Sequence, residues 1–134
     1  MKTKYSLLLL VFLVPFLADA QKKSPNMNED GVYSTVEEKP EYPGGEKALR
    51  TFIAENVKYP TEAIRDSISG KVYVSFIVDE KGNVEQAKIA RSVNPLLDKE
   101  AIRVVKLMDG WIPGKEKGEA VKVSYTVPIN FALK

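Results

Sequence analysis

Side chains capable of covalent or metal chemistry are scarce in this sequence. The 134 residues include no histidine and no cysteine, which excludes a Ser-His-Asp triad, a cysteine nucleophile and an ordinary zinc site. The glycine-rich patterns that cradle phosphates, G-x-x-x-x-G-K-[ST] and G-x-G-x-x-G, are also missing. Carboxylate chemistry remains possible in principle.

The most suggestive carboxylates are the neighbours Asp79 and Glu80, which resemble an acid/base pair. They stand at the start of the segment Asp79-Glu80-Lys81-Gly82-Asn83, whose composition is that of a hairpin loop with glycine in the left-handed conformation. Adjacent side chains at a hairpin tip point apart into water, so we interpret both residues as turn residues. The sequence predicts no enzyme, no cofactor and no metal.

The charge balance also limits the class of partner. The formal net charge is +2 at pH 7, and a nearly neutral chain lacks the clustered Lys and Arg that polyanion binding requires. We therefore expect no nucleic-acid partner.

The first 20 residues have the features of a secretory signal peptide. Two lysines precede an apolar run from residue 7 to residue 18, and Ala18-Asp19-Ala20 fits the small-x-small cleavage pattern. A retained membrane anchor is the alternative, but a run of about a dozen residues is short of the ~20 that span a bilayer. We expect cleavage after Ala20.

The residues from 121 to 133 form the most regular pattern in the chain. The odd positions are apolar: Val121, Val123, Tyr125, Val127, Ile129, Phe131 and Leu133. This period of two predicts a long β-strand with one buried face. Pro128 has no N–H to give to a ladder, which favours a strand at the edge of a sheet. Such an edge can dock a further strand.

The remaining segments predict an α+β domain, with helices on one face of a three-stranded antiparallel sheet. A Tyr42-Pro43-Gly44-Gly45 turn launches the first helix, although a partner contact is the alternative there. The predicted elements are helices near 46–56, 60–67 and 94–110, strands 71–79, 84–92 and 121–133, and a short β-prone run at 32–36. A right-handed crossover through the last helix places strand 121–133 beside strand 71–79.

Two further features are interpreted as core. The stripe Leu97, Ala101, Val104 and Met108 has helical spacing and should face the sheet. Trp111, alone after that helix, is predicted to plug the core, with a functional patch formed with Pro113 as the alternative.

Eight motifs follow one another along the chain: Pro40 to Gly45, Tyr59-Pro60 with Ala63, Gly70 to Phe76, Asp79 through Gly82-Asn83-Val84, Ser92, Leu97-Asp98 with Ala101, Trp111 to Gly114, and Val127 to Phe131. In this order they resemble the C-terminal domain of the energy transducer TonB, and the first resembles the version found in Bacteroidetes-type bacteria. The resemblance covers roughly residues 40–133. It divides the chain into a signal peptide (1–20), a short polar lead with a candidate edge strand (21–38) and the TonB-like domain (39–134).

The resemblance implies a periplasmic domain that binds the TonB box of an outer-membrane transporter as an added strand, beside its own last strand. The partner-binding residues carried over are Val121, Lys122, Val123, Ser124, Tyr125, Thr126, Val127, Asn130 and Phe131. A complete transducer also keeps a membrane helix that meets inner-membrane motor proteins, followed by a Pro-rich arm. Here the hydrophobic run resembles a cleavable one, so contact with motor proteins is not expected unless the protein stays anchored in the inner membrane, facing the periplasm.

Two alternatives stay open. The same edge could join two copies of the chain into a homodimer, as a structural module without a transporter partner. The run from Asp30 to Val36 could also pair with the last strand of its own chain and occupy the docking edge.

Overall fold

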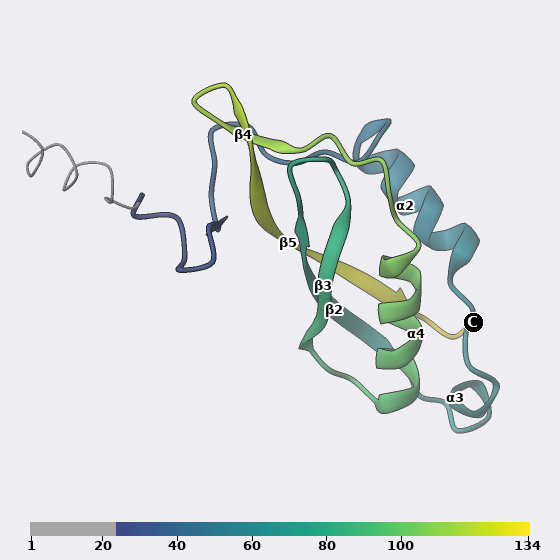
Figure 1. Cartoon of the computed structure of the whole chain (residues 1–134). Coiled ribbons are helices and arrows are strands. Elements are labelled where there is room, and N and C mark those ends of the chain that lie inside the picture. The colour runs from purple at the N-terminus through teal and green to yellow at the C-terminus, as the bar shows by residue number, and fades with distance from the viewer. Residues whose placement is uncertain (1–23) are drawn as a thin grey trace, which may run out of the picture.

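The computed structural model describes residues 24–134 (Figure 1), so the predicted signal peptide lies outside the described residues. The strands are β1 (Val32–Tyr33), β2 (Gly70–Val78), β3 (Val84–Arg91), β4 (Gly114–Glu116) and β5 (Glu119–Phe131). The helices are α2 (Gly45–Asn56), α3 (Thr61–Arg65) and α4 (Pro95–Lys106). The predicted α+β class is confirmed, with the helices gathered on one side of the sheet.

The sheet has the order β1-β5-β2-β3. The central strand β2 is antiparallel to β3 and also to β5, with which it pairs without interruption from Gly70↔Phe131 to Val78↔Val123. The predicted position of the last strand beside β2 is confirmed. Because α4 links β3 to β5, this helix lies over the sheet and positions β5 at the side away from β3 (Figure 1).

The strand predicted at 84–92, which is β3, alternates less regularly between apolar and polar residues than β2 and β5 do, and the structure shows why. β3 contains two register shifts against β2, and Gln86 has a φ of 54°. An extra residue in one strand interrupts the alternation of side chains between the two faces. β2 itself runs in continuous register with β5.

Two strands differ from the prediction. The polar segment 115–118, expected to be a loop, contributes to β4 and to a tight turn in which Lys117 and Gly118 both have positive φ. Lys115 and Glu116 carry no apolar alternation, so backbone pairing with β5 alone defines this strand.

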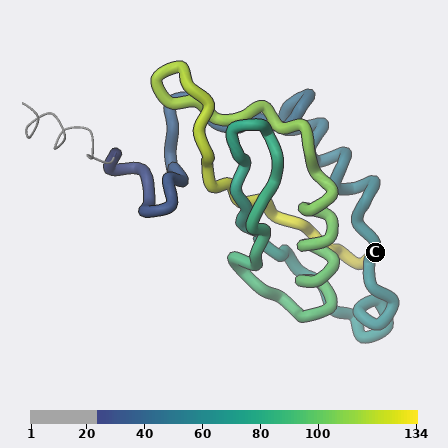
Figure 2. Tube along the Cα trace, in the orientation of Figure 1, coloured from purple at the N-terminus to yellow at the C-terminus, as the bar shows by residue number. Residues whose placement is uncertain are grey.

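β1 is shorter than the predicted run 32–36 and pairs with β5 in parallel, Val32 with Lys122 and Tyr33 with Val123. It is also the second arm of a small hairpin, because Met27 bridges Tyr33 on its other side. Figure 2 shows this segment beside the start of β5 before the chain crosses to α2.

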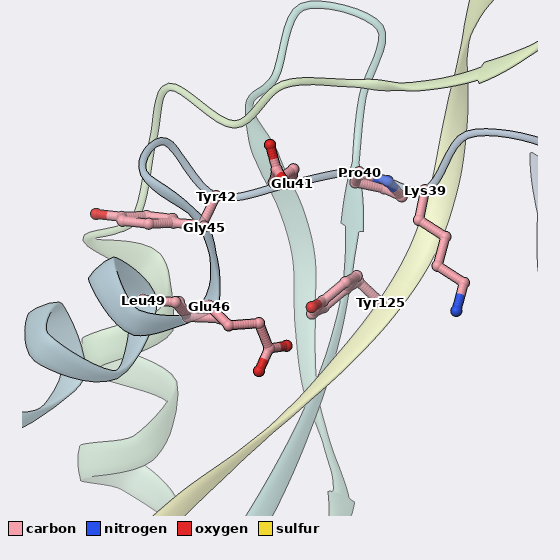
Figure 3. Close-up of a pocket in the computed structure, with 8 residues that line it drawn as sticks. All are labelled: Lys39, Pro40, Glu41, Tyr42, Gly45, Glu46, Leu49 and Tyr125. Carbon is pink, nitrogen blue, oxygen red and sulfur yellow. The ribbon is translucent and has the colours of Figure 1, made fainter.

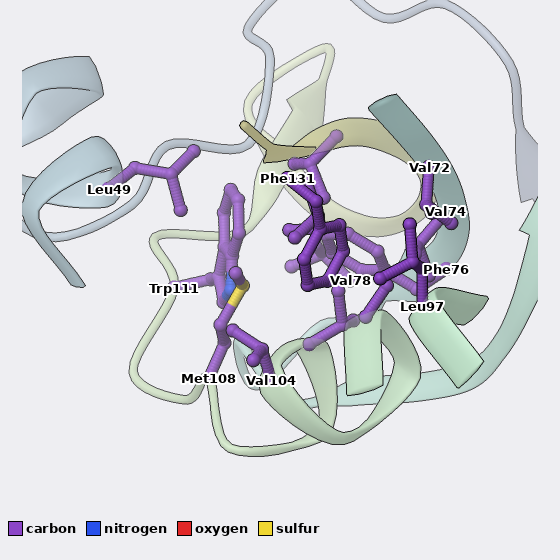
Figure 4. Packing of buried hydrophobic residues seen from close by; sticks show 14 of the residues in the cluster. Leu49, Val72, Val74, Phe76, Val78, Leu97, Val104, Met108, Trp111 and Phe131 are labelled. Atoms are coloured by element: carbon purple, nitrogen blue, oxygen red, sulfur yellow. The ribbon is translucent and has the colours of Figure 1, made fainter. Parts of the chain in front are cut away.

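The core lies between the sheet and α4 (Figure 4). The strands contribute Val72, Val74, Phe76, Val78, Val127, Ile129 and Phe131, all buried. The predicted helical stripe is buried as well, although α4 ends at Lys106 and Met108 lies beyond the helix. The Asn94 side chain accepts the N–H of Leu96 at 2.8 Å, which confirms the predicted N-terminal cap.

Trp111 is a core residue, as predicted, with 3% of its surface exposed. Its ring packs against Phe76 and Tyr125, with centroids 5.6 and 5.0 Å away. Its backbone N–H donates to the carbonyl of Gly82 at 3.1 Å, so the β2–β3 hairpin tip is pinned against the segment that follows α4.

Candidate functional site

The candidate site is the side of β5 that faces away from β2, which we call the outer edge. β1 pairs with this edge at Lys122 and Val123. Among residues 24–134, no strand pairs with it from Ser124 to Phe131. The predicted pairing of the N-terminal run with the last strand therefore exists, but it covers only the start of the edge.

The direction of the backbone groups along β5 follows from the β2–β3 hairpin. Asp79 donates its N–H to Asn83 at 2.9 Å and accepts the N–H of Gly82 at 3.0 Å, so its backbone groups point toward β3. Successive residues in a strand point their backbone groups to opposite neighbours. Even-numbered residues of β2 therefore face β5, where they meet odd-numbered partners.

The even-numbered residues of β5 consequently direct their backbone groups to the outer edge. These residues are Ser124, Thr126, Pro128 and Asn130, and their side chains are exposed. The N–H that Pro128 lacks would lie on the open side of β5. The ladder between β5 and β2 therefore loses no donor at this position. The interpretation of Pro128 as an edge residue fits this geometry.

The structure divides the predicted partner-binding residues into two groups. Val121 pairs with Gly114 of β4, whereas Lys122 and Val123 pair with β1. The other six, Ser124, Tyr125, Thr126, Val127, Asn130 and Phe131, lie in the part of β5 whose outer edge is open.

Two hollows lie between the outer edge and α2. The first, of about 340 Å³, is lined by residues 39–42, the start of α2 and Tyr125 (Figure 3). The second, of about 390 Å³, is lined by Arg50, Ile53, Ala54, Val57, Lys71, Pro128 and Asn130.

Sequence reasoning did not identify the α2 wall. The spacing of Ile53 and Val57 predicts a helix, but it does not show that these residues, which pack against the core, are only half-buried and also line a hollow beside β5.

The first hollow has an acidic side. The carboxylate of Glu46 points toward the phenol of Tyr125, while the ammonium of Lys39 points away (Figure 3). Burial raises the pKa of Tyr125, and the charge of Glu46 raises it further. The hollow therefore presents hydrogen-bond acceptors beside an aromatic ring.

Asp79 belongs to the loop, as predicted, and not to a reactive pair. Its Oδ1 accepts the N–H groups of Lys81 at 2.9 Å and Asn83 at 2.8 Å. Desolvation acts to raise the pKa of Asp79, but these hydrogen bonds outweigh it and lower the pKa. Within residues 24–134 no group of three carboxylates is placed to hold a metal ion.

α2 is anchored near both ends, at Trp111 and at α4. Before its start, Tyr42 packs edge-on against Trp111 with centroids 5.4 Å apart. Beyond its end, Arg103 of α4 donates to the carbonyl of Asn56 at 2.7 Å, and Glu100 accepts the N–H of Lys58 at 2.7 Å. Glu100 and Arg103 also form an ion pair at 2.7 Å. These contacts hold α2 at its distance from the outer edge.

The Glu100 contacts give a testable pH dependence. The hydrogen bond from Arg103 is the largest effect on the pKa of Glu100 and lowers it. A depressed native pKa means that the stabilisation is present above the unfolded pKa, about 4.3, and is lost as pH falls through the native pKa. Glu100→Gln should therefore destabilise the protein by about 1–2 kcal/mol at pH 7, and by less near pH 3.

Urea unfolding of the wild type and Glu100→Gln at pH 7, 5 and 3 measures this difference. Glu55→Gln, at an exposed position of α2, is the matched control and should change stability little at any pH. A Glu100→Gln cost that stays constant from pH 7 to 3 would contradict the assigned role.

No helix within residues 24–134 is long and apolar enough to cross a membrane. No curated protein matches the chain. Two solution structures of the Helicobacter pylori TonB C-terminal domain do. One, of residues 179–285, is 25% identical with a TM-score of 0.50, over 64% of this chain and 78% of that one. The other, of residues 194–285, is 26% identical with a TM-score of 0.50, over 66% of this chain and 92% of that one.

The family model for the C-terminal region of the TonB protein of Gram-negative bacteria matches residues 55–133. This family consists of non-catalytic modules of energy transduction that interact with TonB-dependent transporters. The match begins at the end of α2 and includes the whole of β2, β3, α4 and β5. The chain belongs to the TonB C-terminal domain family, and its role is TonB-like.

Proposed function

We propose that this protein is an exported periplasmic module that binds the TonB box of an outer-membrane transporter by adding it as a strand to the outer edge of β5. The observation that carries the proposal is the row of outward-facing backbone groups, the N–H and C=O of Ser124, Thr126 and Asn130 and the C=O of Pro128. In strand addition, such groups supply the main-chain hydrogen bonds and alternate side chains supply selectivity.

Other features support the same proposal. A long unpaired edge in a folded protein is a liability unless it has a partner, and this one is neither blunted by a charged cluster nor covered by a described strand beyond Val123. The predicted signal peptide supports the periplasmic location, where the periplasmic ends of transporters are accessible. The chain would then act without its own membrane helix.

Alternate N-methylation of a peptide tests strand addition directly. The probe is a synthetic ten-residue TonB-box peptide from a transporter of the same bacterium, titrated against the protein without residues 1–20. We expect micromolar binding. Methylating each amide in turn should weaken binding at least tenfold at every second position, because only alternate N–H groups of an added strand face β5.

The protein side of the pairing has its own matched variants. Thr126→Pro removes one outward N–H and should weaken binding about tenfold, the loss of about one hydrogen bond. Thr126→Val keeps that N–H and should bind as the wild type does. Methylation effects without alternation, or no binding at all, would overturn the proposal. A tight dimer in sedimentation, together with no binding, would instead favour self-association through this edge.

A further inference from the structure

The segment that precedes the family match is placed along the outer edge. The match starts at residue 55, and the described residues before it include β1, the stretch 39–42 and nearly all of α2. β1 covers the beginning of the edge, and the other two line the hollows beside the rest. These elements therefore turn an open edge into a groove.

One flank of α2 forms the wall of this groove. The residues that line the hollows are Gly45, Glu46, Leu49, Arg50, Ile53, Ala54 and Val57. Their spacing of three to four places them on one face of a helix. Along β5, Tyr125 lies in the first hollow and Pro128 and Asn130 lie in the second, so helix and strand follow the groove in the same direction.

The wall is held by contacts that do not involve the outer edge. Tyr42 rests on Trp111, and the far end of α2 is bonded to Arg103 and Glu100, so neither anchor uses the outer edge. A binding groove that is formed in advance avoids the cost of ordering its walls when the partner arrives.

The dimensions suit an extended peptide. Strands rise about 3.3 Å per residue, so the five steps from Tyr125 to Asn130 span roughly 17 Å. Side chains on one face of an added strand recur every second residue. Residues i and i+4 of that strand lie about 13 Å apart, between the spacing of Tyr125 from Pro128 and that of Tyr125 from Asn130.

The hollows differ in chemistry. In the first, the Glu46 carboxylate points toward the Tyr125 phenol, whereas the side chain of Glu41, which also lines the hollow, points away from both (Figure 3). In the second, Ile53, Ala54 and Val57 supply an apolar wall opposite Pro128, with Arg50 and Lys71 also in the lining. The first suits a side chain that donates a hydrogen bond, and the second suits an apolar side chain.

We propose that α2 is the specificity wall of the docking groove, selecting an extended segment that carries a hydrogen-bond donor over Glu46 and an apolar side chain four residues away over Ala54. The inference rests on the proposed strand addition and deepens it, because β5 then supplies pairing while α2 supplies side-chain selection. Binding also buries one face of the added strand and leaves the other face in water.

Blocking the second hollow tests the wall. Ala54→Trp fills the apolar hollow and should weaken binding of the TonB-box peptide at least tenfold. Glu55→Trp places the same side chain on α2 outside either hollow and should leave affinity within twofold of the wild type. Circular dichroism and thermal unfolding of both variants establish that they are folded.

An aspartate scan of the peptide gives a second readout. Each position is replaced in turn, and the largest loss should fall on the residue over the first hollow, where Glu46 repels a carboxylate. Arg50 and Lys71 line the second hollow and should reduce the loss there. Filling the second hollow in Ala54→Trp should change the effect of aspartate at the residue over that hollow and leave the effect over Glu46 as in the wild type. For the first hollow, Glu46→Gln should weaken a peptide with Lys at that position more than one with Ala.

The two proposals fail separately. If alternate N-methylation weakens binding but Ala54→Trp and the aspartate scan have no effect, strand addition stands and the specificity wall is overturned. If N-methylation shows no alternation, strand addition itself fails, and any effect of Ala54→Trp would then report a different mode of contact with α2.

Discussion

Gly82→Ala should destabilise the protein by about 3 kcal/mol or more, the range of severe single substitutions. Gly82 has a φ of +84°, and a Cβ there would lie 2.1 Å from the backbone oxygen of Trp111. A backbone carbonyl cannot move aside as a flexible side chain can, so either the hairpin tip or the segment after α4 must shift. Part of the cost is the left-handed conformation itself, about 1–2 kcal/mol for a residue with a Cβ.

Gly118→Ala separates the two contributions. Gly118 has a similar φ, +80°, but nothing lies within 4 Å of its added Cβ. It should therefore show the conformational cost alone, about 1 kcal/mol. Urea unfolding of both variants measures the difference, and equal losses for Gly82→Ala and Gly118→Ala would contradict the close approach to Trp111.

Trp111→Ala should cost about 3–5 kcal/mol, as for other large aromatic residues removed from a core. The ring packs against Phe76, Tyr42 and Tyr125, and its loss would also remove the support beneath the first hollow. Peptide affinity should fall along with stability, because Tyr42 anchors the start of α2 on this ring.

Trp111→Phe is the informative comparison. The indole Nε1 is buried and has no hydrogen-bond partner among the described residues, so removing it costs no hydrogen bond. Phenylalanine retains most of the ring contacts, and the loss should be below half that of Trp111→Ala. Chemical unfolding measures both. A Phe variant as unstable as the Ala variant would mean that the indole N–H is essential.

The central part of the fold followed from the sequence because local and long-range signals agree there. The alternation in residues 121–133 and 71–79 predicts two strands with buried faces, and the Asn94-Pro95 start predicts α4. A right-handed crossover through α4 then places the last strand beside β2, on the side away from β3. In each case, side-chain burial and backbone preference point to the same structure.

The remaining elements depend on pairing that side-chain pattern does not encode. β4 is polar, and β1 is held by two pairs with β5 and by the bridge from Met27. Likewise, the apolar spacing of α2 predicts a helix, but it cannot show that Ile53 and Val57, which pack against the core, also line a hollow beside β5. The anchors of α2 on Trp111 and Arg103 join residues far apart in the sequence, and these contacts determine where the helix lies.

The attachments of the stretch 24–41 also determine how the molecule would respond to tension. After β1, this stretch is held to the body of the domain by separate small contacts, at Glu38 with Lys115 and at Glu41 with Ile112. Pulled from its N-terminal side, it would detach one contact at a time, starting with β1. The detached stretch could extend to at most ~60 Å before the force reached α2 and the sheet. The N-terminal lead would thus extend under tension before the folded domain bears any load.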